Sequence, residues 1–147
     1  MLPLRRPAGQ QGNDLYKAGK PDQAIDFYRR AANLAPSEQA PLSNLAAAYF
    51  EFDDYNSSIE AAQAALSLLK DDEAGAVARQ KLSLRLAKAH LNLLNYEAAR
   101  SMLEAAADGD EKRDMLKALL SMDVPDEDRK ALHAKVILEL PKFKPRL

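Results

Sequence analysis

Apolar positions along the chain are filled mainly by Ala and Leu, whereas Val and Ile are scarce and Thr is absent. Strands favour β-branched residues, so this pattern predicts an all-α chain. Segments such as LSNLAAAYF (42–50) are strong helix formers, and Pro7, Pro21 and Pro125 suit the first turn of a helix, where no backbone hydrogen bond is lost. Helices are expected near 7–18, 21–34, 38–52, 55–69, 73–93, 96–107, 110–122 and 126–140.

Small and large side chains recur in three windows, residues 11–36, 45–70 and 86–111, with offsets of 34 and then 41 residues. This pattern suits two antiparallel helices per window, in which small residues let the helices approach and larger ones fill the gap. One such pair cannot bury its apolar face alone, so the pairs are expected to stack. The recurring positions are Gly12, Ala46 and Ala87; Leu15, Tyr49 and His90; Ala24, Ser58 and Ala99; Tyr28, Ala62 and Leu103; and Ala31, Ala65 and Ala106.

The 34-residue period, with Gly12, Ala24, Tyr28, Ala31 and Pro36 in place, resembles the tetratricopeptide repeat. The resemblance covers about residues 6–113 and implies a right-handed superhelical solenoid of three helix pairs. The seven extra residues before the third window, around DDEAGAV, are expected to lengthen the fifth helix at its start. Residues 114–140 are expected to form two capping or extension helices, and the basic tail 141–147 to be mobile.

Asn44 is out of place in its segment, because Asn in a helix interior is about 0.5–0.7 kcal/mol worse than Ala. The repeat alignment puts it on the first helix of its pair, which in such repeats faces the concave surface. Asn13 and a Lys/Arg pair fall on the first helices of the neighbouring windows. Together these residues suit a carboxylate, because Asn supplies neutral amide donors and Lys and Arg supply charge-assisted bonds.

The expected concave surface is basic, although the formal net charge of the chain is −1. It collects five basic residues and a single acidic one, Glu51. Charge of one sign in a concave cleft attracts a ligand of the opposite sign, so an acidic ligand is predicted. The basic residues are Arg6, Lys17, Lys81, Arg85 and Lys88.

This set resembles the carboxylate-clamp subclass of tetratricopeptide domains, which binds the acidic EEVD tails of cytosolic heat-shock chaperones. Asn13, Asn44, Lys81 and Arg85 match four of the five clamp positions, and Gly9 stands where the subclass has Lys. The resemblance implies that these four residues bind a terminal carboxylate. Arg6 lies one turn before Gly9 and is a candidate substitute. Lys17, Phe50, Leu84, Lys88 and Leu91 are expected to support the groove, with the apolar members packing a ligand side chain.

Other chemistries have little support. The absence of Cys excludes disulfides, zinc thiolates and a Cys nucleophile, and the two histidines, His90 and His133, are far apart in the chain. No phosphate-binding glycine loop is present. A pI of about 6.1 argues against nucleic-acid or acidic-membrane binding, and no apolar run approaches the ~18 residues of a membrane span. We therefore expect no cofactor and no metal, and a cytoplasmic interaction protein rather than an enzyme.

Two alternatives to peptide binding remain open at this point. The chain can be a scaffold that binds another protein through its convex face or its terminal helices. It also resembles, in the spacing around SNLAAAYFEFDDY and KLSLRLAKAHLNLLNY, N-terminal repeat regions of some fungal multidomain proteins, which would make it an adaptor segment of a larger protein.

Overall fold

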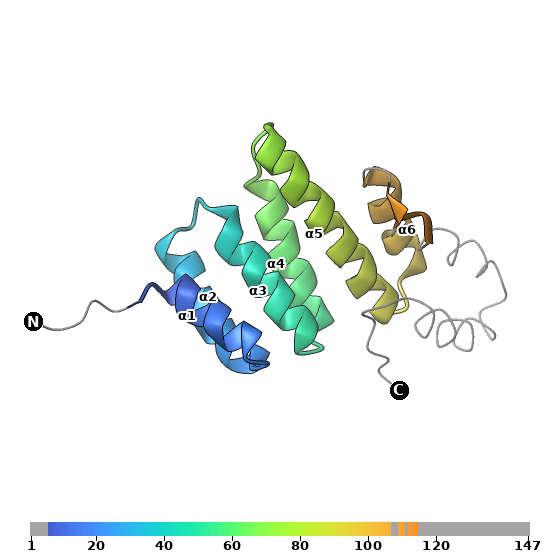
Figure 1. Ribbon diagram of the computed structural model, residues 1–147. Coiled ribbons are helices and arrows are strands. Elements are labelled where there is room, and N and C mark those ends of the chain that lie inside the picture. Colours follow the sequence, from blue (N-terminus) through green and yellow to red (C-terminus); the bar gives the residue numbers. More distant parts are fainter. Residues whose placement is uncertain (1–5, 107–108, 111, 115–147) are drawn as a thin grey trace, which may run out of the picture. The chain divides into compact units, whose positions relative to one another are not determined.

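The computed structural model describes residues 6–106, 109–110 and 112–114, and every regular element in this part of the chain is a helix. The predicted all-α class is therefore confirmed. Residues 110 and 112–114 are also helical; the rest of the two helices predicted at 110–122 and 126–140, and the tail 141–147, lie outside the described residues. The helices (Figure 1) are α1 (Ala8–Lys17), α2 (Pro21–Leu34), α3 (Gln39–Glu51), α4 (Tyr55–Ser67), α5 (Glu73–Asn92) and α6 (Tyr96–Ala105).

The helices are arranged as hairpins. Three residues join α1 to α2, α3 to α4 and α5 to α6, and the members of each pair pack against each other. The first two pairs also pack together through α2 and α3 and form one compact unit, Met1–Asp72, whereas α5 and α6 belong to a second unit, Glu73–Leu147. Within each pair, the predicted arrangement of two helices per repeat is present.

The three turns inside the pairs have the same backbone structure. In each, the middle residue has a positive φ, and the amide of the next residue donates to a carbonyl five positions earlier. This pattern closes the first helix of each pair by satisfying its last carbonyl groups. The middle residues are Gly19 (φ 74°), Asp53 (φ 63°) and Leu94 (φ 63°). The long bonds run from Lys20 to Leu15 (2.9 Å), from Asp54 to Tyr49 (2.9 Å) and from Asn95 to His90 (2.8 Å).

Leu94 should be strained in this turn, because a left-handed backbone brings the Cβ of an L-residue close to a carbonyl oxygen, at about 1–2 kcal/mol per residue. Leu94→Gly is expected to raise the free energy of unfolding by about 0.5–1 kcal/mol, since the greater freedom of Gly in the unfolded chain offsets part of the relief. Urea denaturation measures the change. Gly19→Ala, which introduces the same strain in the first turn, should have the opposite sign; equal signs for the two variants would contradict the prediction.

Most of the recurring sequence positions are buried between the two helices of their pair, whereas Leu15, Ala31, Tyr49 and His90 are half-buried. Ser58 shows how a polar residue fits there: its hydroxyl is fully buried and donates to the carbonyl of Ala46 at 2.8 Å. The bond satisfies the hydroxyl and joins α4 to α3. The other buried members are apolar or small, so the spacing predicted from the sequence matches the packed core. Buried on the first helices are Gly12, Ala46 and Ala87, and on the second helices Ala24, Ser58, Ala99, Tyr28, Ala62 and Leu103.

Helices α1 and α2 approach each other closely at Gly12. A Cβ atom added there would lie 2.7 Å from two carbons of the Tyr28 ring, a distance that real Cβ contacts do not show. Gly9, three residues earlier on α1, is different, because its nearest neighbour would be the Cβ of Ala31 at 4.0 Å, an ordinary contact. Of these two glycines in one helix, only Gly12 is required by the packing.

Helix α5 has 20 residues and α3 has 13, and the seven additional residues are all at the start of α5. The end of α5 corresponds to the end of α3 at the 41-residue offset, since Glu51 and Asn92 are the two last residues. The predicted extension of the fifth helix by the DDEAGAV region is therefore confirmed, with Asp71 and Asp72 immediately before the helix.

Candidate functional site

Asn44 lies in the interior of α3 and is half-buried. It is not the N-cap of the helix, which is Glu38, and its side chain makes no hydrogen bond to any residue that the structure describes. An Asn that neither caps a helix nor bonds to its neighbours brings the helix no local benefit. Its amide group is therefore available to a ligand.

Asn13, on α1, is exposed and has one internal partner. The hydroxyl of Tyr28 donates to its side-chain carbonyl oxygen, Oδ1, over 2.6 Å. The amide nitrogen, Nδ2, has no partner among the described residues. Asn13 thus keeps two N–H donors for a ligand while its oxygen accepts a hydrogen bond from Tyr28.

Lys81 and Arg85 lie on α5, in the second unit. Because they are four residues apart, they occupy the same side of that helix, with Lys88 a further turn along. Lys81 is exposed, and Arg85 and Lys88 are half-buried and interact with other groups of the protein. Asn13 and Asn44 belong to the first unit, so the structure gives two pairs of predicted site residues, one in each unit.

The predicted apolar members of the site differ in how much surface they keep. Phe50 is only 8% exposed, because its ring packs edge-on against Tyr55 with the ring centres 5.3 Å apart. Leu91 is 2% exposed. Leu84 is half-buried and has surface to offer a ligand. The periodicity of the sequence gave the face of the helix for these residues but not the depth of their burial.

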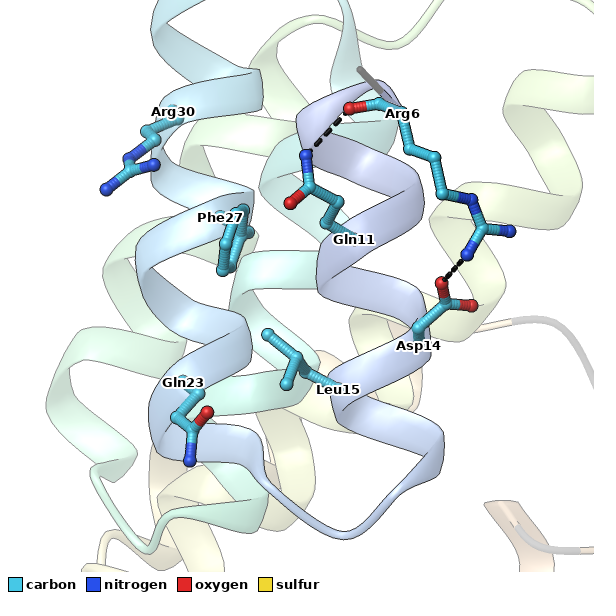
Figure 2. A pocket seen from close by; sticks show the side chains of 7 residues that line it. All are labelled: Arg6, Gln11, Asp14, Leu15, Gln23, Phe27 and Arg30. Carbon is cyan, nitrogen blue, oxygen red and sulfur yellow. Dashed lines mark hydrogen bonds and ion pairs between the residues drawn. The ribbon is translucent and has the colours of Figure 1, made fainter. Parts of the chain in front are cut away.

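A pocket of about 630 Å³ lies beside α1 and α2 (Figure 2) and was not predicted from the sequence. Its apolar part is formed by Leu15 and Phe27, both half-buried, and the guanidinium of Arg30 lies over the Phe27 ring, 5.1 Å from the ring centre. Polar side chains surround this apolar patch. The lining residues are Arg6, Gln11, Asp14, Leu15, Gln23, Phe27 and Arg30.

A change of residue type at the repeat positions is the sequence signal for this pocket. Three positions that are apolar and buried in the second pair carry polar or larger side chains in the first pair, where they line the pocket. A position-by-position comparison of the first two windows shows this change and could have indicated the pocket. The matched residues, 34 positions apart, are Gln11 and Leu45, Asp14 and Ala48, and Phe27 and Ala61.

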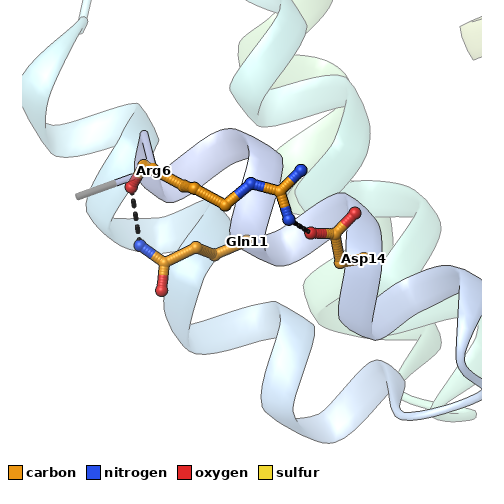
Figure 3. A network of polar contacts seen from close by, with 3 residues as sticks. All are labelled: Arg6, Gln11 and Asp14. Carbon is orange, nitrogen blue, oxygen red and sulfur yellow. Dashed lines mark hydrogen bonds and ion pairs between the residues drawn. The ribbon is translucent and has the colours of Figure 1, made fainter. Parts of the chain in front are cut away.

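Arg6 lies at the edge of this pocket and is engaged within α1 and its start (Figure 3). Its guanidinium forms an ion pair with Asp14, and its carbonyl oxygen accepts a hydrogen bond from the side chain of Gln11 at 2.7 Å. Helix α1 begins at Ala8, after Pro7, so Arg6 precedes the helix. The side chain predicted to replace the missing Lys at Gly9 is thus paired with a carboxylate of its own unit. Lys17, in the last turn of α1, is exposed.

His90, in the last turn of α5, is half-buried, and its ring nitrogen Nδ1 is buried with no hydrogen-bond partner among the described residues. Burial lowers the pKa of this imidazole below its usual value of 6.5. The unfolded chain therefore takes up a proton at a higher pH than the folded one. The contribution of His90 to the free energy of unfolding is fully present above about pH 6.5. It decreases as the pH falls through the pKa of His90 in the unfolded chain and then through its lower pKa in the folded protein.

We therefore expect the free energy of unfolding to be lower at about pH 5 than at about pH 8, and the decrease to be smaller in His90→Leu, which carries the residue found at this repeat position in the first pair. Urea denaturation at both pH values measures the difference. His133→Gln leaves the imidazole at position 90 in place and should keep the decrease. An unchanged pH dependence in His90→Leu would rule out His90 as its source.

Within the described residues, no group of three or more acidic or histidine side chains could hold a metal ion. None of the helices described above is both long and apolar enough to cross a membrane.

No protein-family model matches this chain. The chain is similar to the Hsp70-Hsp90 organising protein of Plasmodium falciparum (isolate 3D7), with 26% identical residues over 113 positions. The similarity covers 77% of this chain and 20% of that protein, so the chain spans about a fifth of the length of the relative it matches.

Proposed function

We propose that this chain is a protein-interaction module that binds the acidic C-terminal end of a partner protein through Asn13, Asn44, Lys81 and Arg85. The observation that carries the proposal is Asn44, a polar residue inside α3 with no side-chain hydrogen bond to the described residues. Its cost to the helix is explained if the amide serves a ligand.

The donor set has the chemistry that a terminal carboxylate requires. A carboxylate offers acceptors only, and the amide nitrogens of Asn13 and Asn44 with the cations of Lys81 and Arg85 are donors only. Bonds from Lys and Arg to a carboxylate are charge-assisted and stronger than neutral ones. Capture of a C-terminal carboxylate is a recurring mode of peptide recognition.

The similarity to an Hsp70-Hsp90 organising protein supports chaperones as the class of partner. We take the EEVD-type tail as the ligand because it combines acidic side chains with a terminal carboxylate. In the same proposal, the three helix pairs form a superhelix that brings the four residues to one concave surface, and the protein acts in the cytoplasm by binding rather than by catalysis.

Isothermal titration calorimetry with two synthetic peptides tests the proposal. Both end in EEVD; one has a free carboxyl terminus and the other is amidated. The free acid is expected to bind with a Kd in the micromolar range, which corresponds to about 8 kcal/mol, and the amidated peptide more weakly. Equal affinities for the two peptides would reject the proposal.

Gly9 stands at the fifth proposed clamp position, which therefore lacks a cation, and the position has room for a side chain. Gly9→Lys is expected to tighten binding of the free-acid peptide about threefold, a modest gain because Lys is disfavoured near the start of a helix. The same titration measures it. Gly9→Ala fills the position without adding charge and should keep the wild-type affinity; an equal gain in both variants would show that the charge is not the cause.

A further inference from the structure

Tyr28, on α2, contacts two neighbouring residues of α1, Gly12 and Asn13. It is 3% exposed, and its ring lies against Gly12, where a Cβ atom would come within 2.7 Å of the ring carbons. The ring can take this position because Gly12 has no side chain. From there the Tyr28 hydroxyl reaches Oδ1 of Asn13, the residue that follows Gly12, at 2.6 Å. Gly12 thus leaves room for the Tyr28 ring, and Asn13, the next residue of α1, accepts a hydrogen bond from the Tyr28 hydroxyl.

In this hydrogen bond the Tyr28 hydroxyl is the donor and Oδ1 of Asn13 is the acceptor. Burial raises the pKa of the Tyr28 hydroxyl above the usual value of 10.0, so the group remains protonated at neutral pH and can donate. An Asn side chain has a donor end and an acceptor end, and a free one can turn either toward a ligand. With its oxygen bound to Tyr28, Asn13 has the NH₂ group left.

We propose that Tyr28 is a positioning and specificity-determining residue, which makes Asn13 a donor-only group and so selects a carboxylate over an amide at this part of the site. The inference rests on the proposed function and adds a residue that touches no ligand. Asn44 has no equivalent support, because Ala62 occupies the Tyr28 position in the second pair. In this proposal Asn13 contributes to the discrimination between a carboxylate and an amide, whereas the Asn44 side chain can turn either end of its amide toward a ligand.

The proposal is tested with Tyr28→Phe, which removes the hydroxyl and keeps the ring against Gly12. Affinity for the free-acid EEVD peptide is expected to fall about fivefold, and the preference for the free acid over the amidated peptide to fall with it. Tyr49→Phe is the matched control: it removes a hydroxyl of the same unit that bonds to Arg29 instead of Asn13, and should retain both affinity and preference. Thermal unfolding of each variant separates an effect on the site from an effect on stability.

The side-chain amide of Asn13 supplies a second measurement that needs no peptide. Its pair of NMR signals, assigned by their loss in Asn13→Asp, should shift in Tyr28→Phe and stay in place in Tyr49→Phe. Asn13→Asp keeps an acceptor for Tyr28 but removes both donors, so it should lower the preference for the free acid, while Lys81 and Arg85 retain part of it.

The outcomes distinguish this inference from the proposed function. A wild-type chain that binds neither peptide, or both equally, rejects the proposed function and with it the selectivity assigned to Tyr28. A wild-type chain that prefers the free acid, together with a Tyr28→Phe variant of unchanged affinity and preference, overturns the role of Tyr28 alone. A Tyr28→Phe variant that loses affinity equally for both peptides overturns it as well.

Discussion

Replacing Arg85 by Ala is expected to weaken binding of the free-acid EEVD peptide about tenfold or more. Removing one charge-assisted hydrogen bond to a ligand costs about 1.5–3 kcal/mol, which is a large share of the ~8 kcal/mol of a micromolar complex. The amidated peptide should lose much less, because it lacks the terminal charge that Arg85 is proposed to bind. Calorimetric titration of both peptides measures the two losses.

Arg100 provides the control for this prediction. It is an exposed Arg on α6, in the same unit as Arg85 but on the other helix of the pair, and Arg100→Ala should leave the affinity unchanged. Because Arg85 also interacts within the protein, the thermal unfolding of both variants must be compared. Equal affinities of the Arg85→Ala and wild-type chains would remove Arg85 from the site.

Gly12→Ala is expected to lower the free energy of unfolding by about 1–3 kcal/mol, the usual cost of forcing an extra carbon into a packed core. The added Cβ would lie 2.7 Å from the Tyr28 ring, and that ring is buried between the helices of its pair. The variant should also weaken peptide binding, because a displaced ring moves the hydroxyl that bonds to Asn13. Urea denaturation and peptide titration report the two effects separately.

Gly9→Ala is the matched substitution on the same helix. Its Cβ would meet Ala31 at 4.0 Å, so no clash opposes the better helix propensity of Ala, and stability should rise by up to about 1 kcal/mol. Opposite signs for the two glycines would confirm that packing, and not helix propensity, fixes Gly12. A stabilising Gly12→Ala would contradict the close contact with Tyr28.

Most of the described fold could be predicted from the sequence. The order of small and large residues gave the three helix pairs, and the two offsets gave the longer α5, because close helix packing leaves few choices at the contact positions. The predicted ends were less accurate: α4 stops at Ser67 and not at 69, and α6 at Ala105 and not at 107. Helix ends depend on local capping bonds, which a pattern of apolar residues does not specify.

The candidate site was less accessible to prediction. Spacing alone put Asn44 on its helix face, but the bond between Tyr28 and Asn13 depends on the rotamers of two side chains 15 residues apart. The pairing of Arg6 with Asp14 depends on where α1 starts, and the burial of Phe50 on its contact with Tyr55. Sequence periodicity predicts the direction of a side chain from its helix and not the partner that it meets there.

The three turns share one backbone structure and differ in the residue at the positive-φ position, so the chain allows residue types to be compared at that position. Gly, Asp and Leu occupy one left-handed position in three copies of the same hydrogen-bonded frame, at residues 19, 53 and 94. Exchanging these residues among the three positions would separate the intrinsic cost of a side chain at positive φ from the contribution of its surroundings. The first two positions lie in the same compact unit. The effect of one residue type on stability can thus be measured in up to three turns of the same protein, and the agreement of the three values checks the result.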